Sequence, residues 1–450
     1  MQPVPEITTY TEALRAIWDR SGYDKGFISN PFAGDDAARL GLVRTQTLLT
    51  HLGHHPLPYA IVHVAGSKGK GSTCTMIAAI LRAAEVRTGI YMSPQLHSFR
   101  ERFDINGELI SEGDFVALTK LFIGAAEEIE AENPSLGEIT AFEISTAMAL
   151  GWFAQQRVDV AVIEVGLGGT LDATNIVDPA ISVITTLDYE HTAILGETLA
   201  EIASNKAGII KQDRPVVTAS QPSEAMTVIR ARADEMNASL QIAGVSWQVT
   251  GDDRCFCFRD DSDELHDLSL AMVGNHQIDN AGLAIAAVQQ LPGLEITESA
   301  IRAGLAVASL PARFEETADT QGRHIIIDGA HTPKSAAALA QAIASRYPGK
   351  QPTLVIGMLA DKNPQAVLAP LLEISERVIV VQPPSPRAMP VTELAAAVEA
   401  MGREVEICAR VEDGLAAADG ELIVVTGSFT TAAEARIVLG LATIVDPPVS

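Results

Sequence analysis

A glycine-rich turn with two lysines follows an apolar segment early in the chain. It reads Val62-His-Val-Ala-Gly66-Ser-Lys-Gly69-Lys70-Gly71-Ser72-Thr73. Glycines allow backbone N–H groups to close around phosphate oxygens, and Lys70 adds a positive charge. A helix that starts near Ser72 would direct the positive end of its dipole at the same anion. The segment therefore predicts a phosphate-binding loop for a nucleoside triphosphate. Its candidate binding residues are Gly66, Ser67, Lys68, Gly69, Lys70, Gly71, Ser72 and Thr73.

The spacing of this loop departs from the common G-x-x-x-x-G-K-[ST] pattern. Only two residues separate Gly66 from Gly69, and Gly71 follows the lysine. This difference indicates a particular branch of phosphate-binding proteins. The competing interpretation is a glycine-rich strand-to-helix turn whose lysine binds nothing. The motifs further along the chain argue against it.

A second candidate is Glu164, at the end of the apolar segment 158–165. Open α/β sheets bind ligands at the carboxyl ends of their strands, and a carboxylate there suits Mg²⁺, which takes one or two carboxylates plus substrate phosphates. Gly166 and Gly168 could instead begin a dinucleotide fingerprint, with Asp188 at about the expected distance of ~20 residues. We exclude this because Leu171 occupies the third glycine position and the following residues read as a loop. A structural cap on that loop is the remaining alternative for Glu164.

A third element follows the next apolar strand. His191 lies in the segment Thr185-Thr-Leu-Asp188-Tyr-Glu190-His191, and Lys206 follows in Lys206-Ala-Gly208-Ile-Ile. A lone histidine or lysine would usually be structural or solvated. Because both lie on elements that leave the same predicted sheet edge, we expect them to join the phosphate loop and Glu164.

The elements that must position these residues alternate between apolar strands and amphipathic helices, which is typical of a parallel sheet covered on both faces. Strands are predicted at 60–65, 87–92, 158–165, 180–186 and 215–219. Helices are predicted at 9–18, 73–84, 113–131, 141–155, 199–208 and 277–290. Residues 240–270 are expected to form short antiparallel strands.

A second α/β run is predicted from Arg323 onward. Its strands are expected at 324–327, 353–356, 377–381 and 422–425, and its helices after Pro333, Pro364, Val391 and Thr430. The fold class is therefore α/β, with a mostly parallel, P-loop-type sheet domain at 1–308, a linker at 309–316 and a smaller Rossmann-like α/β domain at 317–450. At 450 residues the chain exceeds what one core usually supports, which agrees with two domains.

Composition limits the function classes. The net charge of −25 argues against nucleic acid as a partner, because the chain would repel a phosphate backbone. No apolar run approaches the ~20 residues that cross a bilayer, and Met1-Gln-Pro-Val-Pro-Glu6 lacks the features of a secretory signal, so we expect a cytoplasmic protein without membrane contact. Cys74, Cys255, Cys257 and Cys408 form no disulfide or zinc pattern and are interpreted as packing residues.

The motifs taken together resemble the folylpolyglutamate synthases, including the bifunctional dihydrofolate synthase form, which are the folate branch of the Mur ligase superfamily. The resemblance extends from about His51 to Arg436. It rests on the motifs Gly66-Ser-Lys-Gly-Lys-Gly-Ser72, Ser93-Pro94-Gln-Leu, Phe99-Arg-Glu-Arg102, Glu164-Val-Gly-Leu-Gly-Gly169, Leu171-Asp-Ala-Thr-Asn175, His191, Lys206-Ala-Gly-Ile-Ile210 and Asp328-Gly-Ala-His331. The family fold is an ATPase domain followed by a smaller Rossmann-like domain.

The resemblance also implies roles for individual residues. Lys70 and its flanking glycines would bind the β- and γ-phosphates of ATP. Ser93 and Glu164 would hold one Mg²⁺, while Glu164, His191 and a carbamylated Lys206 would serve a second. Nucleotide contacts are implied for His276, Asn280, Arg313 and Asp328. Contacts with the other substrates are implied for Phe99, Arg100, Arg102, Asp172 and His331.

Several positions depart from the family pattern. Gln95 stands where the family usually has histidine, Thr170 where it has arginine, Thr332 where it has asparagine, and Glu190 where aspartate commonly precedes the metal histidine. Lys68 replaces a frequent asparagine. These departures concern substrate recognition, because they leave the proposed metal ligands and the phosphate-binding lysine in place.

The expected reaction is ATP-dependent ligation of L-glutamate to the carboxylate of dihydropteroate or of a folyl-(poly)glutamate, through an acyl phosphate, by a monomer. Domain closure would exclude the water that hydrolyses such an intermediate. One alternative is a sister Mur-type ligase that acts on another carboxylate. The other is a nucleotide-dependent switch that binds without ligating, since a fold does not determine a function.

Overall fold

The computed structural model describes residues 7–20 and 35–448. Residues 1–6, on which the expectation about a secretory signal rests, lie outside this range. The described chain divides into two compact units. Unit 1 contains the residues up to Ser269, Ile278–Ala308 and the segment from Asp446, and unit 2 contains Leu270–Gln277 and Ser309–Val445. Two short segments thus lie in a different unit from their neighbours in sequence.

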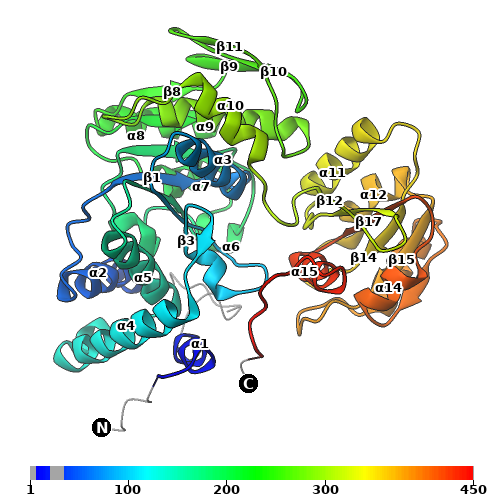
Figure 1. The fold of residues 1–450 in the computed structure, drawn as a ribbon, viewed down its shortest axis with the longest axis horizontal. Helices are drawn as coiled ribbons and strands as arrows, with labels where there is room; N and C mark the ends of the chain where they lie inside the picture. The colour runs from blue at the N-terminus through cyan, green and yellow to red at the C-terminus, as the bar shows by residue number, and fades with distance from the viewer. Residues whose placement is uncertain (1–6, 21–34, 449–450) are drawn as a thin grey trace. The chain divides into compact units, whose positions relative to one another are not determined.

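Unit 1 is built on an eight-stranded sheet in the order β4-β3-β2-β5-β1-β6-β7-β8 (Figure 1). Its strands are β1 (Ala60–Ala65), β2 (Thr88–Tyr91), β3 (Asp104–Ile105), β4 (Glu108–Leu109), β5 (Val160–Glu164), β6 (Ile181–Ile184), β7 (Val216–Thr218) and β8 (Leu240–Ile242). All neighbours from β2 to β8 pair in parallel, and β3 and β4 are antiparallel. The mostly parallel α/β class is therefore confirmed.

The helices of unit 1 include an N-terminal group that packs together, namely α1 (Tyr10–Trp18), α2 (Asp35–His51), α4 (Glu112–Glu132) and α5 (Ala141–Gln155). The others are α3 (Lys70–Ala83), α6 (Thr192–Leu195), α7 (Leu199–Ala207), α8 (Ser223–Glu235), α9 (Asn275–Gln289), whose first turn lies in unit 2, and α10 (Glu298–Val307). Helices α3 and α10 cross closely at Gly304, where a Cβ would lie 2.5 Å from the Ile80 Cα. This contact fixes the helix that follows the phosphate loop.

Residues 240–270 differ from the prediction at their start. Strand β8 joins β7 in parallel at the edge of the large sheet. Only β9 (Trp247–Gly251), β10 (Phe256–Asp260) and β11 (Glu264–Leu268) form the expected antiparallel sheet. The prediction was wrong for β8 because the sequence of a three-residue edge strand does not show which strand it will pair with.

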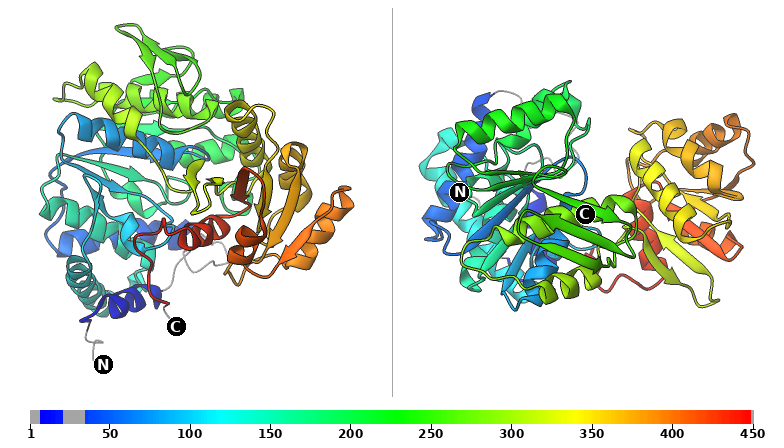
Figure 2. Two further views of the ribbon diagram at one scale, coloured as in Figure 1. Left: turned by 45° about the vertical axis from the view of Figure 1, so that its right-hand side comes forward. Right: turned by 90° about the horizontal axis from the view of Figure 1, so that it is seen from above.

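Unit 2 contains a six-stranded sheet in the order β12-β13-β17-β14-β15-β16. Its strands are β12 (Glu315–Ala318), β13 (His324–Ile327), β14 (Thr353–Ile356), β15 (Arg377–Val381), β16 (Glu406–Cys408) and β17 (Leu422–Thr426). Its helices are α11 (Pro333–Arg346), α12 (Pro364–Ile374), α13 (Val391–Ala400), α14 (Val411–Ala417) and α15 (Phe429–Val438) (Figure 2). Only β12 runs antiparallel to its neighbour, which confirms the second α/β run.

Two further expectations can be compared with the described residues. None of their helices is both long and apolar enough to span a membrane. The four cysteines are free thiols, and Cys74 is buried as predicted. Cys255 is exposed, so its interpretation as a packing residue was wrong. It precedes β10 instead of occupying an inward position within the strand.

Candidate functional site

The predicted phosphate loop lies at the carboxyl end of β1, which is hydrogen-bonded between β5 and β6. Helix α3 begins at Lys70, two residues before the predicted start at Ser72. The reason is Gly69, which caps the helix with φ of 87°, a left-handed conformation that closes the turn early. Lys70, Gly71 and Ser72 therefore lie at the start of the helix, where backbone N–H groups have no carbonyl of an earlier helical turn to bond. The N–H of Thr73 donates to the carbonyl of Gly69 at 2.9 Å.

The loop is held by the chain that follows β6. The backbone N–H groups of Ser67 and Lys68 both donate to the carbonyl of Thr186 at 3.0 Å, and the Ser67 Oγ donates to the carbonyl of Asp188 at 3.0 Å. Gly66 has φ of 153°, and a Cβ there would lie 1.8 Å from the Thr185 Oγ1. The conformation of the loop therefore requires both glycine at 66 and the neighbouring strand end.

Two lysines meet at this loop. The Nζ atoms of Lys70 and Lys206 donate to the carbonyl of Gly66 at 3.1 and 2.9 Å. The Lys206 side chain is 2% exposed and also donates to the Glu190 Oε1 at 2.7 Å. Burial, followed by the charge of Lys70, lowers the pKa of Lys206 to about 8, although Glu190 opposes this change. Burial opposes ionisation of Glu190, but the charges of Lys206 and Lys70 bring the pKa of Glu190 below its usual value.

The loop after β5 determines how closely Lys206 approaches the phosphate loop. A Cβ at Gly169 would lie 2.7 Å from the carbonyl oxygen of Asn205 and 3.0 Å from the Lys206 Cα. The backbone N–H of Thr170 donates to the same Asn205 carbonyl at 2.8 Å. Helix α7 can therefore approach only because residue 169 has no side chain, and this approach carries Lys206 to the phosphate loop.

Glu164 lies at the end of β5, buried, and its Oε2 accepts a hydrogen bond from the backbone N–H of Ser93 at 3.1 Å. Two other side-chain oxygens, Thr73 Oγ1 and Thr185 Oγ1, are buried and lack a hydrogen-bond partner within the described part of the chain. Mg²⁺ prefers oxygen ligands. The carboxylate of Glu164 and the orphaned oxygen of Thr73, in the first turn of the phosphate helix, therefore fit such an ion.

The other predicted metal ligands are arranged differently. His191 is exposed, has φ of 44° and caps α6. Across residues 7–20 and 35–448, no group of three or more His, Cys, Asp or Glu side chains is placed to hold a metal. The Nζ of Lys206 lies 2.7 Å from the Glu190 Oε1. A second metal held by Glu164, His191 and Lys206 stays a prediction.

The predicted substrate residues of the 99–102 motif are mostly packed inside. Phe99 is fully buried among aromatic side chains, and the guanidinium of Arg102 lies 4.4 Å from its ring centroid. The Arg102 Nε donates to the Gln95 Oε1 at 2.8 Å, which gives the unusual Gln95 a structural partner. Arg100 is half-buried and donates to the carbonyl of Ile110 at 2.6 Å. Phe99 and Arg102 thus shape the 93–103 loop, and their contact with substrate stays a prediction.

Asp172 is also buried. It accepts hydrogen bonds from the backbone N–H of Leu167 at 2.8 Å and from the N–H and hydroxyl of Thr174 at 3.0 and 2.5 Å. Burial raises the pKa of Asp172, which these hydrogen bonds oppose. The Nε2 of His63, a fully buried residue of β1, lies 2.9 Å from the same Thr174 hydroxyl. Asp172 therefore organises the loop after β5.

The predicted nucleotide residues on α9 lie in different units. Asn280, in unit 1, is buried, and a Cβ at Gly69 would lie 2.3 Å from its Oδ1. Asn280 thus lies directly against the phosphate loop. His276, in unit 2, lies close to Gly274, whose Cβ would be 2.8 Å from the His276 Cε1.

Unit 2 gathers the remaining three predicted residues. The Asp328 carboxylate accepts hydrogen bonds from the N–H groups of Phe314 at 2.7 Å and Ala330 at 2.8 Å. Burial raises the pKa of Asp328, and the charge of Arg313 opposes this change. The Arg313 guanidinium lies 4.4 Å from the ring centroid of Phe429, and the His331 ring lies 5.5 Å from it. The structure therefore brings Arg313 and His331 to the ring of Phe429, and Asp328 within electrostatic reach of Arg313.

Sequence reasoning missed two residues of these sites. Thr185 contacts Gly66, and its position after an apolar strand could have indicated it. Phe429 begins α15 directly after Gly427 and Ser428, where a strand-to-helix turn again follows an apolar strand. Threonine and phenylalanine have no obvious chemical role in such a site. The position of these residues after a strand was visible in the sequence, but their type gave no reason to choose them as site residues.

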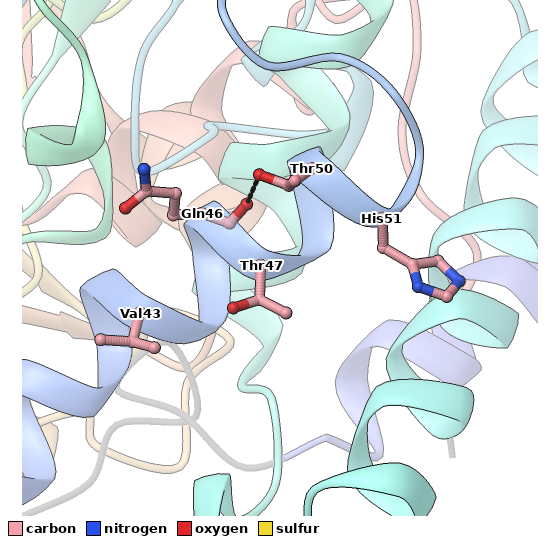
Figure 3. A pocket seen from close by; sticks show the side chains of 5 residues that line it. All are labelled: Val43, Gln46, Thr47, Thr50 and His51. Carbon is pink, nitrogen blue, oxygen red and sulfur yellow. Dashed lines mark hydrogen bonds between the residues drawn. The ribbon is translucent and has the colours of Figure 1, made fainter.

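A hollow of about 400 Å³ on α2 is lined by Val43, Gln46, Thr47, Thr50 and His51 (Figure 3). It contains none of the predicted site residues. Beside it, the His51 Nε2 lies within hydrogen-bond distance of the Glu128 Oε2, at 3.1 Å. The hollow is therefore distinct from the phosphate loop.

Comparisons with known proteins identify the family of the chain. The chain matches the family models of the Mur ligase middle domain over residues 64–288 and of the Mur ligase glutamate ligase domain over residues 312–429. The dihydrofolate synthase/folylpolyglutamate synthase of Bacillus subtilis is 34% identical over 357 residues, 77% of this chain and 82% of that relative. The folylpolyglutamate synthase structure from Thermotoga maritima is 34% identical, covers 96% of both chains and has a TM-score of 0.84.

A solved Escherichia coli relative in complex with DHPP and ADP is 31% identical, with a TM-score of 0.82 and coverage of 97% of this chain and 99% of that one. Both domains of the family are matched in order, and the similarity extends through the phosphate loop and the Asp328 cluster. The chain therefore belongs to the Mur ligase family, in the branch of the folylpolyglutamate and dihydrofolate synthases.

Proposed function

We propose that this protein joins L-glutamate to the carboxylate of a folate-type substrate, either dihydropteroate or a folyl-(poly)glutamate, at the expense of ATP, which is converted to ADP and phosphate. The observation that carries the proposal is the meeting of Lys70 and Lys206 at the carbonyl of Gly66, on a loop whose glycines and helix start suit a phosphate chain. A folate-type acceptor is supported by the names of the relatives.

The reaction would occur in two steps. A carboxylate oxygen of the acceptor attacks the γ-phosphorus of ATP, so that a new O–P bond forms, the bond to the β-phosphate oxygen breaks, and ADP leaves. The uncharged amine of glutamate then attacks the acyl carbon, phosphate leaves with the electron pair of the C–O bond, and the nitrogen loses its extra proton. Phosphorylation is needed because a carboxylate is a poor electrophile.

Phosphoryl transfer depends mainly on positioning and electrostatics. Lys70 would contact the β- and γ-phosphates, and the N–H groups at the start of α3 would bind their oxygens. Before its carbamylation, Lys206 would hold the Gly66 carbonyl and Glu190 in place through its two hydrogen bonds. Asn280, packed on Gly69, would help to orient the nucleotide. These groups would stabilise the charge that accumulates on the transferring phosphoryl group.

Glu164, Ser93 and Thr73 are the residues that would hold Mg²⁺. When bound, this ion would neutralise phosphate charge and align the attacking carboxylate. Carbamylation of Lys206 is part of the proposal because its lowered pKa favours the neutral amine that reacts with carbon dioxide. The carbamate would have to exchange the present bonds to Gly66 and Glu190 for new ones. Mass spectrometry of the intact protein under bicarbonate, with Lys206→Arg as the control, tests this modification.

The cluster of unit 2 would complete the reaction. Arg313 and Asp328 would contact the nucleotide, and His331 would contact the incoming glutamate. We further propose that the protein acts as a cytoplasmic monomer. Sedimentation at working concentration tests the monomer, and fractionation of cells tests the location.

Mass spectrometry of products tests the proposed function. The purified protein is incubated with MgATP and glutamate, separately with dihydropteroate and with tetrahydrofolate. A gain of one glutamate on dihydropteroate alone means a dihydrofolate synthase, gains on both mean the bifunctional enzyme, and a gain on tetrahydrofolate alone means the polyglutamate enzyme. Without a gain on either, the proposal fails, and a panel of other carboxylates then tests a sister Mur-type ligase.

A further inference from the structure

The segment from Asp446 returns to unit 1 after the chain has completed unit 2. It contacts two places that are distant in the sequence. The Asp446 Oδ1 accepts a hydrogen bond from the Tyr10 hydroxyl at 2.6 Å, and its Oδ2 accepts one from the backbone N–H of Phe99 at 2.7 Å. The backbone N–H of Asp446 donates to the carbonyl of His97 at 3.0 Å. Figures 1 and 2 both show this end of the chain beside α1.

These contacts leave few polar groups of Asp446 unused. Both carboxylate oxygens and the backbone N–H are engaged, and each partner is a different group of α1 or of the 93–103 loop. A carboxylate forms hydrogen bonds that are stronger than those of a neutral acceptor. Tyr10 joins the two segments further, because its hydroxyl also lies 3.2 Å from the Ser98 Oγ.

The loop that Asp446 holds leads directly to the proposed site. It begins at Ser93, whose backbone N–H contacts Glu164, and it continues through Gln95 to Phe99 and Arg102. The Gln95–Arg102 hydrogen bond joins its two ends, so a displacement near Phe99 would be transmitted to the residues next to Ser93. The hydrogen bonds of Glu101 to the N–H groups of Leu96, His97 and Ser98 stiffen the part between them.

From these contacts we infer that Asp446 is a positioning residue for the folate-type substrate, because it clasps the 93–103 loop to α1. The expected kinetic effect rests on the proposed function, whereas the hydrogen bonds that form the clasp are observed in the structure. Asp446 lies beyond the region matched by the glutamate ligase domain model, which ends at residue 429. The clasp therefore joins Tyr10 and Asp446, which lie outside the two matched regions, to a loop inside the region matched by the middle-domain model.

The first test is hydrogen exchange of the full-length protein and of Asp446→Ala, without any substrate. We expect the amides of residues 96–103 to exchange roughly tenfold faster in the variant, since local opening no longer breaks the Asp446 hydrogen bonds. Exchange in α3, which these bonds do not touch, should remain unchanged. Equal exchange at 96–103 in the two folded proteins would overturn the inference.

The second test is steady-state kinetics. We expect Asp446→Ala to raise KM for the folate-type substrate roughly tenfold, and to leave kcat and KM for ATP within about twofold, because the loss of a charged acceptor loosens the loop and not the phosphate helix. A parallel rise in KM for ATP would contradict the assignment to this loop.

Milder variants keep the test decisive if Asp446→Ala does not fold. Asp446→Asn keeps an acceptor oxygen and should raise KM for the folate-type substrate less than Asp446→Ala does. Tyr10→Phe removes only one partner of Asp446 and should raise this KM less than Asp446→Asn does. Asp413→Asn, which alters an exposed carboxylate paired with Arg410, is the matched control and should behave as the wild type. If the wild type forms no product, the proposed function fails, while the exchange experiment still decides whether the clasp exists.

Discussion

At the scale of single residues, the proposed chemistry depends on two lysine side chains that share one carbonyl acceptor. Lys70 is half-buried and Lys206 almost fully buried, so the two differ in how strongly the protein environment acts on their charge. A buried charge interacts more strongly with phosphate than a solvated one, because less water screens it. The loop therefore concentrates positive charge in a chain whose net charge is −25.

The first prediction concerns Lys70. Replacing Lys70 with Met should lower kcat by roughly 10²- to 10³-fold, the range seen when one stabilising donor is removed from a transition state. Initial rates of ADP release at saturating substrate would measure this effect. Lys120→Met, which alters an exposed lysine of α4, is the control and should keep nearly the wild-type activity. An equal loss in both variants would contradict the role given to Lys70.

The second prediction concerns His63, which burial and then the charge of Lys211 hold at a pKa of about 3, against 6.5 for an ordinary histidine. The unfolded chain therefore binds a proton below pH 6.5 that the folded chain rejects. Folding stability is retained above this pH and is lost as the pH falls toward 3, by at most about 1.4 kcal/mol per pH unit from this group.

Denaturant unfolding from pH 7 to pH 4 would test the His63 prediction. His63→Gln should reduce the slope of unfolding free energy against pH over this window, whatever it does to stability at pH 7. His266→Gln changes an exposed histidine and should keep the wild-type slope. An unchanged slope in His63→Gln would show that the buried imidazole does not control acid sensitivity.

The predicted site residues that lie at strand ends or beside glycines could be selected from local sequence alone. Lys70, Glu164 and Lys206 have chemical side chains directly beside a strand end or a conspicuous glycine, so residue type and position were both visible. Thr185 and Phe429 act through contacts with residues that are distant in the sequence. Their roles arise from packing, which a single sequence does not display. The burial of Phe99 and Arg102 was missed for the same reason.

At the scale of elements, the position of α7 depends on the absence of a side chain at Gly169. The third prediction is that Gly169→Ala pushes α7 away, because the new Cβ would meet backbone atoms that cannot rotate aside. We expect a loss of roughly 1 to 3 kcal/mol in unfolding free energy and a weaker contact of Lys206 with the loop. Calorimetry and the affinity for a nucleotide analogue would measure the two effects.

Gly124→Ala provides the control for this prediction. Gly124 lies inside α4, and a Cβ there has no atom within 4 Å. Alanine is the better helix former, so this variant should be more stable by about 0.5 to 1 kcal/mol. If both variants changed stability in the same direction, backbone propensity and not the α7 contact would explain the result.

Element type was easier to predict than element limits and pairing. The long helix α4 repeats its buried apolar positions at helical spacing along its length, which makes the pattern clear. The start of α3 was misplaced because a left-handed Gly69 closes the turn earlier than the apolar pattern begins. β8 was misassigned because three residues can pair with any open edge. Register and neighbour choice depend on the complete sheet.

At the scale of the whole molecule, charge predicts an unusual response to salt. Folate-type substrates, glutamate and ATP are anionic, and a chain with a net charge of −25 repels them at long range. Salt screens this repulsion, so the fourth prediction is that kcat/KM for the folate-type substrate increases between ~20 and ~150 mM KCl, as the Debye length falls below about 10 Å. A steep decrease would mean that the lysines of the loop dominate approach as well as binding.

The path of the chain through its two units has a consequence for synthesis. Asp446 is separated from its partners Tyr10 and Phe99 by 436 and 347 residues, and all of unit 2 from Ser309 is translated before it. Domains generally fold as they leave the ribosome, N-terminal parts first. Helix α1 and the 93–103 loop therefore lack their hydrogen bonds to Asp446 until unit 2 has been synthesised. The nascent unit 1 would be most open to chaperones and proteases during this interval.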